Sequence, residues 1–142
     1  MINKSQAKEL LNLLHEDYRE CKITLVNSKL EYLILALKEV RDLDFKHHIE
    51  VLKGEVLGNY NSKRNHAQIY LMNLKRRVNE EETPSKYNVV YAADVLFHEV
   101  RHHFQNKYNR LRCKDIEKDC NRFSARMLEK YWDEIIEILD IK

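Results

Sequence analysis

The spacing of hydrophobic residues predicts two helices at the start of the chain, with a short strand between them. Residues 3–20 place leucines near the helical period, which predicts an amphipathic helix. Residues 22–26 (KITLV) form a short β-prone run. Ser28 stands three residues before Glu31, which is the spacing of a capping box, so the second helix is predicted from about residue 30 to residue 40.

The middle of the chain changes to an alternation of polar and apolar residues. Residues 48–52, 55–60 and 66–74 each have the pattern of a strand, and the polar residues 61–65 indicate a turn between the last two. These segments together predict a small antiparallel sheet. The charged segment 76–85 is predicted to be a loop.

The helical period returns in the last part of the chain. Thr83 and Pro84 are residue types favoured at the N-cap and the first position of a helix, which should run to about Tyr108. Its apolar residues gather on one side, which must pack on the core: Val89, Ala93, Leu96, Phe97, Val100 and Phe104. His98 and His102 fall on the opposite side, so both imidazoles should face away from the main core.

A final long helix completes the predicted fold. Residues 109–114 form a short connection, and residues 115–139 should return as a helix that packs antiparallel to the preceding one. The predicted fold class is therefore α+β, with a small antiparallel or mixed sheet packed against helices. The length fits one domain over residues 1–142.

Composition narrows the range of partners and compartments. The 25 basic and 23 acidic residues are mostly scattered and give a net charge of +2, which argues against a nucleic-acid-binding face. The first twenty residues contain no signal-peptide core, and no apolar run reaches membrane-spanning length. The three cysteines, Cys21, Cys113 and Cys120, lack C-x-x-C spacing. We therefore expect a cytoplasmic protein without nucleic-acid or membrane partners.

The candidate chemistry lies in the string His98-Glu99-Val100-Arg101-His102, which has the form H-E-x-x-H. On a helix, side chains four positions apart are neighbours, with about 5–6 Å between their Cβ atoms. Two imidazoles at that spacing can bind one zinc ion, and the glutamate beside the first can take a proton from water at the metal. The string therefore predicts His98 and His102 as zinc ligands and Glu99 as a general base.

A catalytic zinc site needs a third protein ligand. The longer pattern that ends in a third histidine is excluded, because Gln105 and Tyr108 stand where it requires glycine and histidine. The remaining candidates are three carboxylates near the start of the final helix, Asp115, Glu117 and Asp119. Glu117 lies on the flank of that helix's apolar stripe, where a carboxylate is costly unless it is paired or metal-bound. We predict Glu117 as the ligand; the alternative is a solvated glutamate that favours the helix N-terminus.

Two stretches, AADVLFHEVRHHFQ and EKDCNRFSARML, resemble the motif helices of the ImmA/IrrE-type zinc metallopeptidases of the gluzincin group. The resemblance implies a zincin-like fold and a bound Zn²⁺ ion. It makes His98, His102 and Glu117 the metal ligands and Glu99 the general base. It also places Asn121, one turn after Glu117, as a polar neighbour of the metal site.

The chain departs from the family pattern at two positions within these motifs. Arg101 precedes the second histidine, where a small residue is usual, and Cys120 precedes Asn121, where alanine is usual. We interpret Cys120 as a small core residue.

The residues together predict a zinc-dependent peptidase that hydrolyses a peptide bond of a protein substrate, with Glu99 acting on the zinc-bound water. An extended substrate should add a strand along residues 67–72. His103, Tyr91 and Tyr108 are the candidates for stabilising the oxyanion. The alternative is a catalytically inactive interaction protein on a metallopeptidase-like scaffold. Glu99 argues against that alternative, because a structural zinc site has no need of a base.

Overall fold

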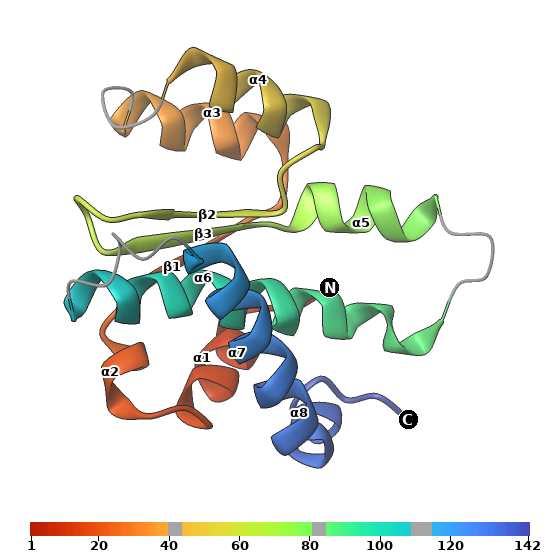
Figure 1. Ribbon diagram of the computed structural model, residues 1–142. Helices are drawn as coiled ribbons and strands as arrows, with labels where there is room; N and C mark the ends of the chain where they lie inside the picture. Colours follow the sequence, from red (N-terminus) through yellow and green to blue (C-terminus); the bar gives the residue numbers. More distant parts are fainter. Residues whose placement is uncertain (40–43, 81–84, 109–114) are drawn as a thin grey trace.

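The computed structural model describes residues 1–39, 44–80, 85–108 and 115–142. A three-stranded sheet lies between two groups of helices (Figure 1). One face of the sheet is covered by α3 (Lys29–Lys38) and α4 (Phe45–Lys53). The other side holds α1 (Lys4–Asn12), α2 (Glu16–Arg19) and α6 (Val90–Lys107). The protein is thus a mixed α+β fold, as predicted.

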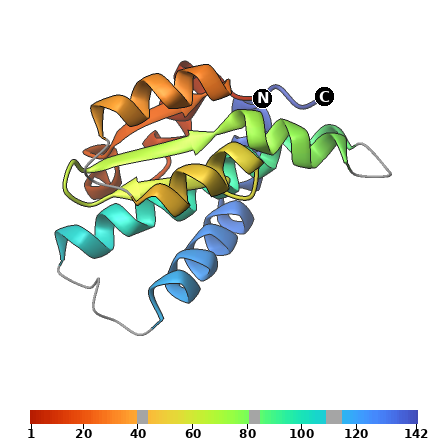
Figure 2. The same cartoon turned by 90° about the horizontal axis from the view of Figure 1, so that it is seen from above.

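The remaining elements extend this arrangement. Strand β3 leads directly into α5 (Leu71–Asn79), and a short 3-10 turn, η1 (Lys86–Val89), precedes α6. Helix α7 (Ile116–Lys130) crosses α6 and is followed by α8 (Trp132–Ile138). Figure 2 shows that α7 lies toward the sheet edge formed by β2.

The strands are ordered β1–β3–β2, so β3 (His66–Tyr70) is the central strand. β1 (Lys22–Val26) pairs with it in parallel, and β2 (Gly58–Asn61) pairs with it antiparallel. The sheet is therefore mixed rather than antiparallel throughout. Because side chains alternate along a strand, Ala67 and Ile69 point toward α6 and join the main apolar core.

One predicted strand is a helix in the structure. Residues 48–52 belong to α4, which begins after Asp44, whose side chain accepts from the backbone N–H of His47 at 2.8 Å. The helix ends at Gly54, which has a left-handed φ of 86°. Over five residues, the alternating pattern of a strand and one turn of a helical pattern look alike. The capping residues Asp44 and Gly54, which lie outside residues 48–52, decide in favour of the helix.

Other predicted boundaries were wrong as well. The strand predicted over residues 66–74 ends at Tyr70, and α5 extends through the first four residues of the predicted loop 76–85. The first helix is divided between α1 and α2, because the side chain of His15 starts a new helix by accepting from the N–H of Asp17 at 3.3 Å. The last helix is divided at Tyr131, whose ψ of 24° departs from helical geometry.

Several predictions fall outside the described residues. These are the helix start at Thr83 and Pro84, the connection at residues 109–114 with Cys113, and the end of the second helix at residue 40. None of the helices within the described ranges is both long and apolar enough to cross a membrane.

Candidate metal centre

Two imidazoles on α6 converge on one carboxylate of α7. The rings of His98 and His102 are 5.1 Å apart between centroids, as expected for residues one helical turn apart. Their Nε2 atoms each lie 3.0 Å from a different oxygen of Glu117. The structure therefore brings together the three residues that the sequence predicted as metal ligands. The expectation that Glu117 lies on the buried flank of the apolar stripe was wrong, however, because its side chain is 68% exposed.

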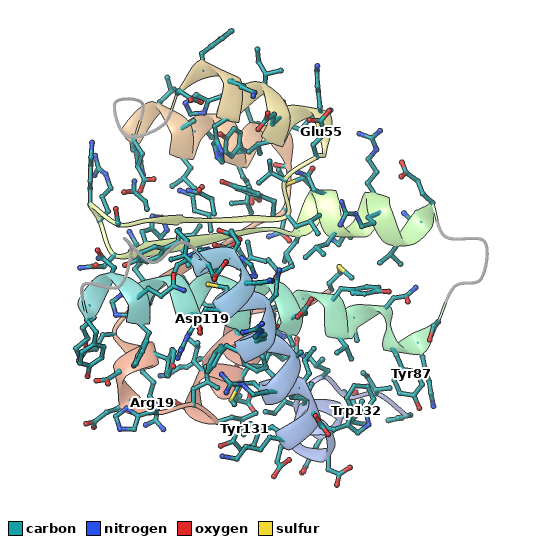
Figure 3. The ribbon with its side chains drawn as sticks, in the orientation of Figure 1. Arg19, Glu55, Tyr87, Asp119, Tyr131 and Trp132 are labelled. Carbon is teal, nitrogen blue, oxygen red and sulfur yellow. The ribbon has the colours of Figure 1, made fainter. Side chains whose placement is uncertain are left out.

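The position of α7 is fixed by polar contacts with α6. Arg101 donates two hydrogen bonds to the carboxylate of Asp119, at 2.8 and 3.1 Å, and a third at 2.7 Å to the hydroxyl of Tyr18. Figure 3 labels Asp119 where α7 crosses α6. Ser124 donates to the backbone carbonyl of Asp94 at 2.9 Å. The hydrogen bonds from Arg101, and also from Gln105, lower the pKa of Asp119. The Asp119 carboxylate is therefore ionised and engaged in these structural contacts.

Gln105 determines which nitrogen of His102 carries the proton. Its Nε2 donates to the carbonyl of Ile116 at 3.0 Å and to Asp119 at 2.9 Å, so its Oε1 must be the atom that faces His102. That oxygen lies 3.0 Å from His102 Nδ1 and can only accept. Nδ1 of His102 therefore carries a hydrogen.

The other nitrogen of His102 then presents a lone pair to a carboxylate oxygen. Burial lowers the pKa of His102, which favours the neutral ring. A neutral ring protonated at Nδ1 leaves Nε2 as an acceptor, and that atom is 3.0 Å from the acceptor Glu117 Oε1. Two acceptors at this distance repel each other unless a proton or a metal ion lies between them.

The donor set therefore fits a metal ion. Two nitrogens and a carboxylate form a common catalytic zinc set. Two donors of one tetrahedral zinc are separated by roughly 3.3 Å, close to the 3.0 Å between each Nε2 and its Glu117 oxygen. The Nδ1 atom of His98 lies 2.9 Å from Asn121 Oδ1, which orients that ring as well. Asn121 thus occupies the neighbouring position that the resemblance implied.

Cys120 also belongs to this cluster, although the sequence predicted it only as a small core residue. The thiol is fully buried, and one donor atom each from His98, His102 and Cys120 all lie within 4.8 Å of one another, so this group could hold a metal ion. Its sulfur, however, approaches His102 at Nδ1, at 3.5 Å, rather than at Nε2. Burial also raises the pKa of the Cys120 thiol to about 12, which disfavours the thiolate that binds metals.

Glu99 lies beside the cluster in a tight, buried position. Its side chain packs over Gly58 of β2, where an added Cβ would come within 2.8 Å of both Glu99 Oε1 and Val95 Cγ1. Burial, together with the negative charge of Glu117, raises the pKa of Glu99 to about 8. Gly58 is thus required for the glutamate to reach the sheet, a role that the sequence alone did not reveal.

The cluster opens into a pocket of about 320 Å³ between α6, α7 and β2. It is lined by Gly58, Asn59, Tyr60, Ser62, His98, Glu99, His102 and Glu117. Among the described residues no strand pairs with the outer edge of β2. The prediction of a substrate edge along residues 67–72 was therefore wrong: β3 is paired on both sides, and β2 borders the pocket instead.

The three oxyanion candidates lie in different places. His103 is buried, and its Nδ1 is 3.1 Å from the hydroxyl of Tyr60. Tyr108 donates to Asp17 at 2.6 Å, and Tyr91 lines a separate hollow. None of the three lines the 320 Å³ pocket. Tyr60, which the sequence reasoning did not select, lies closer, with its ring stacked 6.4 Å from that of His102.

No protein-family model, curated protein or solved structure matches the chain.

Proposed function

We propose that this protein is a zinc-dependent peptidase with a zincin-like arrangement, in which His98, His102 and Glu117 hold Zn²⁺. The observation that supports this most is that both Nε2 atoms face Glu117, while the amide of Gln105 keeps a hydrogen on Nδ1 of His102, so that the neutral ring presents an Nε2 lone pair to Glu117. Glu117 is preferred to Cys120 as the third ligand because its oxygens face both Nε2 atoms.

Zinc bound at this position would polarise a scissile carbonyl and acidify a water molecule. Glu99 would take the proton from the attacking water and pass it to the leaving amine. Burial and the charge of Glu117 raise the pKa of Glu99 to about 8 in the metal-free protein, and a bound cation would lower this pKa toward the range in which a carboxylate accepts a proton and returns it. The substrate would lie extended along the open edge of β2, which borders the pocket.

Substitution of Glu99 by glutamine tests the proposal. The variant keeps the shape of the side chain but cannot accept a proton, so we expect unchanged zinc binding and loss of cleavage of an unfolded protein such as casein. Cleavage by Glu99→Gln at the wild-type rate would remove Glu99 as the base. His98→Ala is the companion variant and should lose both zinc and cleavage.

The alternative function is that of an interaction protein that holds zinc for structure. Two features argue against it: the partly open pocket beside the ligands and the buried glutamate within it. Wild-type protein that binds zinc but cleaves no unfolded substrate would favour the alternative.

A further inference from the structure

A second and larger cavity lies along the other edge of the sheet. It has a volume of about 710 Å³, within the range of ligand-binding sites, and runs between α1 and β1. We call it the β1 groove. Its apolar side chains are Ile2, Ala7, Leu11, Ile23 and Leu25, of which Ile23 and Leu25 remain partly exposed.

The β1 groove contains an unpaired strand edge. The N–H of Lys22 donates to the carbonyl of Asn65 at 3.0 Å, so Lys22 and every second residue after it bond toward β3. The backbone groups of Ile23 and Leu25 therefore point outward, as the alternation of a parallel ladder requires. No strand of the described residues pairs with this edge. An open edge with outward N–H and C=O groups is a template for another strand.

The rim of the β1 groove is positively charged. Four of its lining residues are cations, Lys4, Lys8, Arg19 and Lys22, and none is acidic. Lys4 and Lys8 are one turn apart on α1, where like charges repel. Lys4 also occupies the first position of that helix, where a cation opposes the helix dipole and no acidic residue offsets it. Arg19, labelled in Figure 3, is held by the carbonyls of Asn12 and Leu14, both at 3.0 Å. A bound anion would relieve this concentration of charge.

We propose that the β1 groove binds an extended acidic peptide segment, which adds a strand to β1. Apolar side chains of the segment would cover Ile23 and Leu25, and its carboxylates would meet Lys4 and Lys8. The open backbone edge favours a peptide over other anions, because only a strand satisfies the outward N–H and C=O groups together. The groove lies at the opposite edge of the sheet from β2 and the metal pocket, so this binding does not depend on the peptidase proposal.

Fluorescence anisotropy with a labelled heptapeptide of alternating glutamate and valine tests the proposal. Wild-type protein should bind the peptide, and the exposed double variant Lys4→Glu/Lys8→Glu should bind it about tenfold more weakly or worse. The matched control is Lys46→Glu/Lys53→Glu, which reverses two exposed lysines on α4 and should bind like the wild type. Mass spectrometry after the titration checks that the peptide is intact.

Two further measurements separate the β1 groove from other binding sites. Hydrogen exchange followed by NMR should show new protection of the Ile23 and Leu25 amides when the peptide is present. His98→Ala should keep the wild-type affinity for the peptide, since it disturbs only the metal pocket. Lack of binding up to about 1 mM, equal affinity in Lys4→Glu/Lys8→Glu, or unprotected Ile23 and Leu25 amides would each overturn the proposal. Tighter binding of a single-stranded oligonucleotide than of the peptide would also overturn it.

Discussion

Replacement of Gln105 by methionine isolates the contact that orients His102. Gln105 is 2% exposed and takes part in three hydrogen bonds: it donates to Ile116 O and Asp119 and accepts from His102 Nδ1. Methionine has a similar volume and lacks these groups. Each lost hydrogen bond costs about 1 kcal/mol. Asp119 is partly exposed and can bond to water instead, which reduces the loss. We therefore expect the free energy of unfolding to fall by about 2–3 kcal/mol.

Zinc affinity is the more informative measurement for this variant. Removal of a residue that orients a metal-binding histidine typically weakens metal binding by about 10- to 100-fold. Competition with a chromophoric chelator measures this change, and urea denaturation of the zinc-free protein measures stability. Gln68→Met is the matched control, since Gln68 is equally buried but bonds to Glu39, away from the site. A Gln105→Met variant with zinc affinity within about twofold of the wild type would refute the tautomer argument.

Three further predictions concern the neighbouring residues. Glu117→Gln should weaken zinc binding by about tenfold or more, whereas Cys120→Ala should bind zinc like the wild type. A chelator titration in which only Cys120→Ala loses zinc affinity would make Cys120, and not Glu117, the third ligand. Gly58→Ala should lower the free energy of unfolding by about 1–3 kcal/mol, because its Cβ would meet Glu99 and Val95 at 2.8 Å; unchanged stability in urea would show that the glutamate lies elsewhere. The pKa of Glu99 is raised from 4.5 to about 8 in the folded state, because the buried site favours the protonated carboxyl group. The stability that this protonation contributes is fully present below pH 4.5 and is lost as pH rises through about 8. The zinc-free wild type should therefore lose more stability over this pH range than Glu99→Gln, and identical pH profiles would contradict the buried position.

The parts of the site that were predictable from the sequence depend on short spacings. The interval between His98 and His102 fixes their relation on any helix. The cap at Ser28 was confirmed for the same reason: its side chain accepts from the N–H of Glu31, three residues away, at 3.1 Å. Local geometry was enough in each case.

The parts that were not predictable depend on contacts between distant segments. The parallel pairing of β1 with β3 joins residues more than forty positions apart, and no pattern within either strand specifies its partner. Gln105 entered the sequence reasoning only as a residue that excluded a third histidine ligand, although it holds the imidazole of His102. The pairing of Arg101 with Asp119 likewise emerges only when α7 is placed across α6. Such roles are set by packing between helices, which periodicity does not encode.

X-ray absorption spectroscopy of the zinc-loaded protein, combined with metal analysis, tests the central claim most directly. We predict about one zinc per chain, bound by nitrogen and oxygen at about 2.0–2.1 Å, with no sulfur neighbour. A sulfur at about 2.3 Å would assign Cys120 in place of Glu117. Protein that takes up no zinc at equimolar concentration would contradict the account as a whole.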